Sequence, residues 1–121
     1  MIPALRVAFP EIVIEGCFFH FAAALYKNVC EMDLKENYDQ VGSLVRTIIK
    51  EIVALAFAPA NDIRGIYKEI KTAYKLTIAG NQRLRQYLRM YFEPTWMTTD
   101  EYIASWSVYQ QNQRTNNICE G

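Results

Sequence analysis

The sequence has few of the residues that usually carry metal or redox chemistry. Its 121 residues include three cysteines and a single histidine. An odd number of cysteines does not suit a disulfide framework, and the chain does not open with a basic leader followed by a long apolar run. We therefore expect a reducing, intracellular environment and no structural disulfide.

An excess of charge of one sign and a long uncharged segment are also missing. Thirteen Lys and Arg residues balance thirteen Asp and Glu residues, so no overall electrostatic attraction to nucleic acid or to an anionic membrane is expected. The longest nearly uncharged run, "IVALAFAPAN" from Ile52, is far shorter than the ~20 residues that cross a bilayer. We expect one domain without a membrane span, and any preference for a charged partner must be local.

Only one segment has the pattern of a β-strand. In "EIVIEGC", residues 11–17, Ile12 and Ile14 alternate with Glu11, Val13 and Glu15. A strand must pair its backbone donors and acceptors with a neighbour, and no second strand pattern follows. The sequence therefore predicts a single strand over 11–17, with its partners outside this chain.

The remaining sequence has the apolar periodicity of helices. Spacings of three and four predict helices over residues 18–32, 40–57, 61–77 and 82–92, and a short helix that starts at residues 99–101. Gly80-Asn81 separates two of them, and the 82–92 helix is expected to end before Pro94 because proline disfavours the helical backbone ahead of it. The expected fold is mainly α, with four to six helices and the one strand.

The only histidine lies three residues after a cysteine, in Cys17-x-x-His20. A structural zinc site needs four ligands, and Cys30 and Cys119 are the only other thiols that the fold can bring to it. A cysteine nucleophile needs a base and a group that orients the base, and no third group is evident. A buried Cys17 that acts as a small apolar residue is the third interpretation, and all three stay open at this point.

Basic residues gather between Asp62 and Arg89, where seven basic residues accompany two acidic ones. On the 61–77 helix four of them follow at spacings of four, three and four, which places them on one face. Such a face can neutralise DNA phosphates, but it is also the ordinary exposed side of an amphipathic helix. The candidate DNA contacts are Arg64, Lys68, Lys71, Lys75, Arg83, Arg85 and Arg89.

Glu120 has two interpretations. Asn117 precedes it by three residues, so the pair resembles a helix-capping box in which the glutamate reaches back to the helix start. A carboxylate at the start of a helix is also a candidate metal ligand. Both roles use the same oxygens.

Four segments, taken in order, resemble a known family. They are "FPEIVIEGCFFHFAAALYKNV", "VRTIIKEIVALAFAP", "YFEPTW" and "WSVYQQNQRTNNICEG". The C-x-x-H motif after a strand, the LAF-P turn, the Y-E-TW segment and RTNN--E are similar to the late part of the catalytic domain of Mutator-like element (MULE) transposases. The resemblance extends from Phe9 to Gly121, and the combination is more specific than any single motif.

The resemblance implies an RNase H-like core in which two aspartates and a glutamate hold two Mg²⁺ or Mn²⁺ ions for DNA cleavage and strand transfer. Cys17 and His20 match C-x-x-H, which implies that they belong to the catalytic core, where they brace the strand-to-helix corner and His20 lies near the scissile phosphate. Glu120 matches the third catalytic carboxylate, the metal ligand. Arg114 belongs to the loop that delivers this carboxylate and joins the candidate DNA contacts. The implied partners are transposon DNA ends and a second copy of the chain, and the implied location is the nucleus.

The sequence departs from the family at the two aspartates, which are expected ahead of Met1. Asp33, Asp39, Asp62 and Asp100 lie in the wrong segments to replace them. We therefore expect a partial domain over 1–121 that is inactive and binds no metal alone. It would comprise the strand, a helical insertion over about 18–110, and the start of the glutamate-bearing helix at 117–121. The alternatives are a non-enzymatic DNA- or protein-binding helical module and a helical protein unrelated to transposition.

Overall fold

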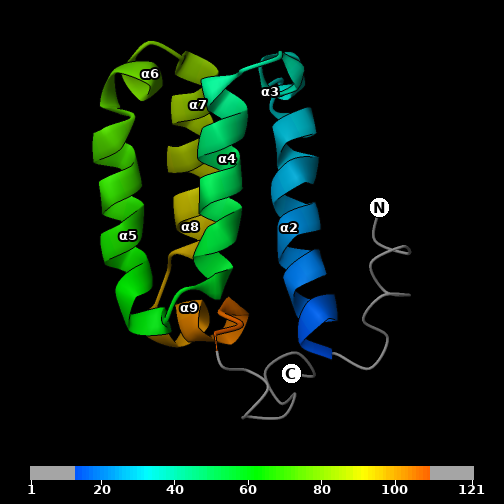
Figure 1. Cartoon of the computed structure of the whole chain (residues 1–121), viewed down its shortest axis with the longest axis vertical. Coiled ribbons are helices and arrows are strands. Elements are labelled where there is room, and N and C mark those ends of the chain that lie inside the picture. Colours follow the sequence, from blue (N-terminus) through cyan, green and yellow to red (C-terminus); the bar gives the residue numbers. More distant parts are fainter. Residues whose placement is uncertain (1–12, 110–121) are drawn as a thin grey trace.

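A computed structural model describes residues 13–109 of the chain and shows a mainly helical fold (Figure 1). Within these residues, no helix combines the length and the apolar character that crossing a lipid bilayer requires. The elements are α2 (Val13–Glu31), α3 (Lys35–Asp39), α4 (Leu44–Ala54), the 3-10 turn η1 (Leu55–Phe57), α5 (Ala60–Ala73), α6 (Lys75–Ala79), α7 (Gln82–Gln86), the π-helical segment η2 (Tyr87–Phe92), α8 (Glu93–Trp96) and α9 (Asp100–Trp106).

The long elements form an antiparallel bundle. In Figure 1, α2, α4, α5 and the continuous segment α7–η2–α8 run alternately up and down, and α9 lies at the lower end. The helix α2 contacts both α4 and η2, α4 contacts α5, and α6 contacts α7. Each long element thus has neighbours on two sides, and its remaining face is exposed.

The predicted strand over 11–17 is wrong where the structure describes it, because residues 13–17 form the first turns of α2. A helix satisfies its own backbone hydrogen bonds, whereas a lone strand leaves them unpaired. Residues 11 and 12 lie outside the described part. The expectation of a mainly α fold is confirmed.

The helix α2 ends in a left-handed cap that the sequence did not reveal. Asp33 has a φ of 63°, and its backbone N–H donates to the carbonyl of Cys30 at 3.4 Å. The N–H of Leu34 donates to the carbonyl of Val29 at 2.9 Å, which completes the pattern of a Schellman motif. Leu34 is fully buried, so this turn is fixed by the core as well as by its hydrogen bonds.

The other predicted helices are present with shifted ends. Ser43, Asn81 and Thr99 cap α4, α7 and α9, because each side-chain oxygen accepts a backbone N–H three residues ahead. The cap at Ser43 explains why the helix predicted over 40–57 starts only at Leu44. The helix predicted over 61–77 is divided into α5 and α6 by a turn residue, Tyr74.

The predicted end before Pro94 is wrong, because the helical segment continues through α8 to Trp96. Backbone hydrogen bonding changes from the π to the α pattern at Glu93, where the N–H still donates to the carbonyl of Leu88. Pro94 therefore occupies the first turn of the new α segment, where proline is tolerated because its missing N–H is not needed.

An aromatic cluster holds α9 against α2. The ring of Phe21 stacks on Trp106 with centroids 4.5 Å apart, and it meets Trp96 edge-on at 4.9 Å. The indole N–H of Trp106 donates to the carbonyl of Trp96 at 2.8 Å. Further along, the buried Tyr87 hydroxyl donates to the carbonyl of Leu25 at 2.7 Å and ties η2 to α2. These contacts fix α7–η2–α8 relative to the first helix.

We expect Phe21→Ala to lower the free energy of unfolding by about 3–5 kcal/mol, because the ring is 1% exposed and its removal leaves a cavity between two indoles. Urea unfolding followed by circular dichroism measures the change. Phe57→Ala is the matched control, since the Phe57 ring is 56% exposed, and we expect a clearly smaller loss. Equal losses would show that the cluster is not the centre of the core.

Candidate functional site

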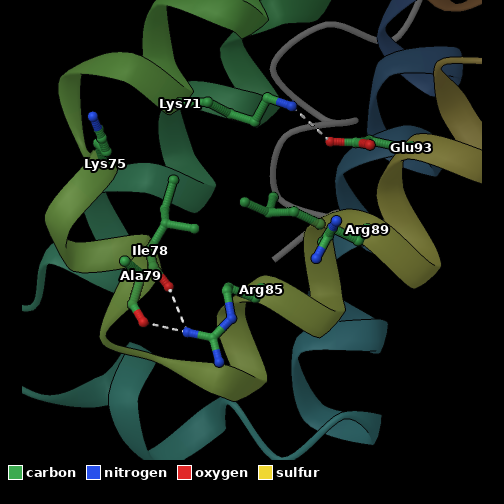
Figure 2. A pocket seen from close by; sticks show the side chains of 8 residues that line it. Lys71, Lys75, Ile78, Ala79, Arg85, Arg89 and Glu93 are labelled. Atoms are coloured by element: carbon green, nitrogen blue, oxygen red, sulfur yellow. Dashed lines mark hydrogen bonds and ion pairs between the residues drawn. The ribbon is translucent and has the colours of Figure 1, made fainter.

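The basic residues predicted from two separate helices meet along one surface of the bundle. A pocket of about 410 Å³ lies between α5–α6 on one side and α7–η2–α8 on the other (Figure 2). One neighbouring hollow shares Lys71 and Glu93 with this pocket, and another shares Arg85 and Arg89 with it. The pocket and the two hollows therefore form a continuous surface. We call it the cationic groove; its charged lining residues are Arg64, Lys68, Lys71, Lys75, Arg85, Arg89 and Glu93.

Packing of the apolar sides places these cations at the groove. On α5, Ile63, Tyr67 and Ile70 are buried in the core, so the basic residues between them are turned toward the edge of the helix. The chain then reverses at Gly80 and Asn81. The helix α7, which Asn81 caps at its start, runs back beside α6. The basic residues of α5–α6 therefore face those of α7–η2 across the groove.

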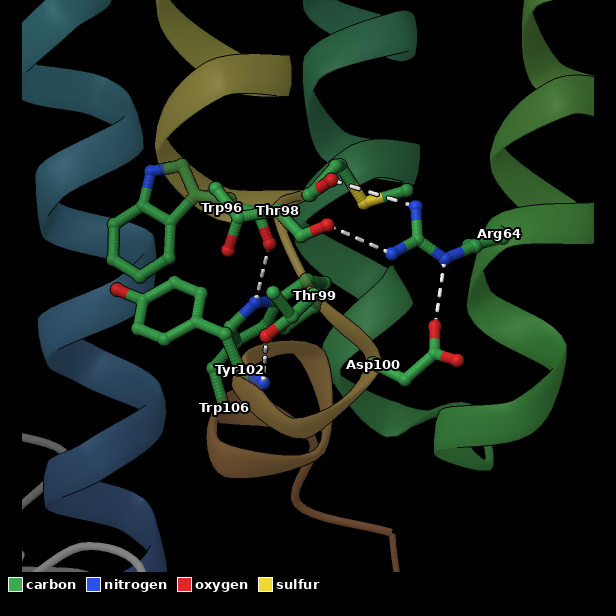
Figure 3. Close-up of polar contacts among 8 residues, drawn as sticks. Arg64, Trp96, Thr98, Thr99, Asp100, Tyr102 and Trp106 are labelled. Carbon is green, nitrogen blue, oxygen red and sulfur yellow. Dashed lines mark hydrogen bonds and ion pairs between the residues drawn. The ribbon is translucent and has the colours of Figure 1, made fainter.

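Arg64 has partners inside the protein (Figure 3). Its Nε donates to a carboxylate oxygen of Asp100 at 2.9 Å, and one guanidinium Nη donates to the carbonyl of Thr98 at 3.0 Å. These bonds join α5 to the loop ahead of α9. The predicted DNA-contacting arginine thus also holds the fold, and the Asp100 carboxylate offsets its charge.

Lys71 meets the only carboxylate of the groove lining. Its Nζ lies 3.0 Å from Oε2 of Glu93, and the same oxygen accepts the hydroxyl proton of Tyr67 at 2.7 Å. The ammonium also lies 4.9 Å from the centre of the Tyr67 ring. Burial, followed by the hydrogen bond to Glu93, raises the pKa of the Tyr67 hydroxyl well above its usual value of 10.0.

Arg85 closes the end of α6. Its guanidinium donates to the carbonyl of Ile78 at 3.3 Å and also to that of Ala79, as Figure 2 shows. The last carbonyls of a helix lack intrahelical donors, and a cation at that end also interacts favourably with the helix dipole. Arg85 is therefore a structural cap that still contributes positive charge to the groove.

Four of the predicted DNA contacts are exposed and have no side-chain hydrogen bond or ion pair within residues 13–109. They are Lys68, Lys75, Arg83 and Arg89. Figure 2 places Lys75 on one wall of the pocket and Arg89 on the other. An anion bound between these walls would gain charge-assisted contacts without breaking an internal pair.

The structure describes the positions of only some of the residues predicted from the family resemblance. His20 is exposed on α2, and the backbone of Cys17 belongs to the same helix, so the motif does not lie at a strand-to-helix corner as expected. Arg114 and Glu120, the predicted metal ligand, lie outside the described residues. Among residues 18–109, whose side chains the structure describes, no three His, Cys, Asp or Glu side chains come close enough to hold a metal ion together.

Comparisons of the chain with protein-family models, curated proteins and solved structures found no match. The similarity to Mutator-like transposases therefore stays a prediction from the sequence motifs. What the chain does must be argued from the chemistry of the cationic groove together with those motifs.

Sequence reasoning missed two residues of the site, Tyr67 and Glu93. Tyr67 follows the apolar periodicity of the predicted 61–77 helix. This pattern accounts for its buried ring but not for the hydrogen bond of its hydroxyl. Glu93 is 22 residues from Lys71, so no local spacing links them. A clue to Glu93 was that it is the one acidic residue between Arg83 and Trp96.

We expect the free energy of unfolding to fall as the pH rises above 10, in part because of Tyr67. The unfolded chain then loses the phenolic proton, whereas the folded chain retains it because its pKa is raised. In Tyr67→Phe this contribution is absent, so the decline with pH should be less steep by about 1.4 kcal/mol per pH unit. Urea unfolding at a series of alkaline pH values, with neutral pH as reference, measures both slopes. Parallel slopes would contradict a buried, un-ionised Tyr67.

Proposed function

We propose that this chain binds the phosphate backbone of DNA through the cationic groove, as the helical part of a Mutator-like transposase. The observation that carries the proposal is the convergence of cations from α5–α6 and from α7–η2 on one continuous surface, although the whole chain is electrically neutral. A neutral protein gains affinity for a polyanion only when its positive charges are gathered locally.

Some cations of the groove are paired within the protein, and others are free to contact a phosphate. Lys75 and Arg89 line opposite walls of the pocket and have no partner in the described part of the chain. Each contact of such a side chain with a phosphate releases a condensed counterion, which makes binding entropically favourable and sensitive to salt. Lys68, which lines the neighbouring hollow, extends this surface along α5.

The transposase assignment within the proposal is supported by the order of the sequence motifs. In this proposal, Glu120 is the third carboxylate of a metal-binding triad that cleaves DNA in the nucleus, and the groove holds the DNA beside it. Divalent ions such as Mg²⁺ supply the nucleophile activation in that chemistry. In this proposal, Cys17 and His20 belong to the same catalytic core. The role proposed for the chain itself is DNA binding.

The proposal predicts a salt-dependent affinity for duplex DNA that depends on the groove. Replacement of a phosphate-contacting cation should lower the steepness of log affinity against log salt by about 0.9 per contact. We expect this loss for Lys75→Gln and for Arg89→Gln, measured by fluorescence anisotropy over a range of salt concentrations. Lys50→Gln, at an exposed position on α4 outside the groove, is the matched control and should retain the parent slope.

Two outcomes would overturn the proposed function. The first is an affinity for DNA that does not change with salt, which is the expectation for a helical protein unrelated to transposition. The second is an equal loss of slope in the groove variants and in the control. Cleavage of DNA by the chain in the presence of Mg²⁺ would overturn the restriction of its role to binding.

A second prediction concerns the only acidic side chain of the groove lining. Glu93→Gln removes a negative charge 3.0 Å from Lys71 but keeps an acceptor for the Tyr67 hydroxyl. We expect DNA affinity at low salt to rise severalfold, about 0.5–1 kcal/mol, because Lys71 is released to the phosphate. Glu36→Gln on α3, outside the groove, is the control and should leave affinity nearly unchanged. A fall in affinity for Glu93→Gln would show that Glu93 does not oppose binding.

A further inference from the structure

Beside the proposed phosphate contact Arg89, the outward face of α7–η2 carries side chains that the phosphate contacts do not account for. Gln82, Gln86, Arg89 and Met90 follow one another at spacings of four, three and one, and all are exposed. We propose that this face enters the major groove of duplex DNA and reads the edges of the bases. The inference rests on the proposed function and adds sequence specificity to it.

The geometry of the segment suits an approach to the major groove. From Gln82 to Trp96 the chain is helical without a break, with the π-helical segment η2 between α7 and α8. Leu84, Tyr87 and Leu88 bury the opposite side of this segment, each being at most 1% exposed. The exposed face is therefore held rigidly by the core, and a helix of this diameter fits a groove about 12 Å wide.

The four side chains form one surface. Together with Arg85 they line a hollow of about 390 Å³. Neither glutamine, nor Arg89, has a side-chain partner within residues 13–109, so their donors and acceptors are available. Met90 is 70% exposed and adds an apolar contact to this face.

The chemistry of this surface matches base edges more closely than phosphates. A glutamine amide can donate and accept at the same time, and it pairs with N6 and N7 of adenine. An apolar methyl such as that of Met90 can contact the methyl group of thymine. No acidic residue occurs from Gln82 to Phe92, so α7 and η2 themselves carry no negative side chain.

The cations beside this face would position the duplex. Lys75 and Lys68 lie across the cationic groove on α6 and α5, and Arg83 is one residue on from Gln82, about 100° around the helix. Phosphate contacts fix the register of a protein on DNA, and base contacts supply the specificity. Both kinds of side chain therefore lie on adjoining surfaces, which share Arg85 and Arg89.

The experiment is selection of bound sequences from a random duplex library with the full chain, followed by anisotropy titrations. The two probes are the selected duplex and a scrambled duplex of the same composition. We expect the chain to prefer the selected duplex by about tenfold or more. Gln82→Ala combined with Gln86→Ala should abolish most of this preference while affinity for the scrambled duplex stays the same. Lys75→Gln should weaken binding to both duplexes alike.

The substitutions are chosen so that the variants keep the fold. Alanine is the strongest helix former, so replacement of two exposed glutamines should not destabilise the segment, and circular dichroism checks this. Gln40→Ala, at an exposed position between α3 and α4, is the matched control and should retain the full preference.

The outcomes separate the inference from the proposed function. Salt-dependent binding with no enriched motif, or a preference that survives loss of both glutamines, would overturn base reading and leave backbone binding in place. Absence of binding to any duplex would overturn both. Tighter binding to duplex RNA than to duplex DNA would also overturn base reading, because the deep and narrow major groove of A-form RNA does not admit a helix.

Discussion

The contact between α5 and η2 is the interaction on which the candidate site depends. The rings of Tyr67 and Phe92 lie 5.2 Å apart in the core, and the next residue, Glu93, accepts the Tyr67 hydroxyl. This contact fixes the separation of the two helices that form the walls of the cationic groove. The free cations on both walls can face a common anion only because apolar side chains bring their helices together.

The basic residues of the groove divide between structural and free roles. Arg64 joins α5 to the loop ahead of α9, Arg85 caps α6, and Lys71 pairs with Glu93. A partly exposed ion pair of this kind contributes little to stability, roughly up to 1 kcal/mol, so Lys71 can exchange Glu93 for a phosphate at small cost. The number of basic residues in the groove therefore overstates the positive charge that is free to bind an anion. Lys68, Lys75 and Arg89 carry this free charge.

The structure changes how the Cys17-x-x-His20 motif should be understood. Both residues lie in the first half of α2. The strand that was expected to carry the motif to a corner is absent from residues 13–17. The coarse expectation of a mainly helical chain is confirmed, whereas the family resemblance and the catalytic role of Glu120, which lies outside the described residues, stay predictions.

From residue 18 onward, the sequence by itself determined roughly where the long helices lie, because the spacing of apolar residues is a local signal. It did not determine their ends at Ser43, Tyr74 and Trp96, and it did not predict α3. It also identified the basic residues. It could not distinguish a short strand from the first turns of α2, since "VIEGC" satisfies both patterns. Only the tertiary structure decided which cations are free, because their partners, such as Asp100 and Glu93, are more than twenty residues away in sequence. Packing of the core brings these groups together, and no local spacing records it.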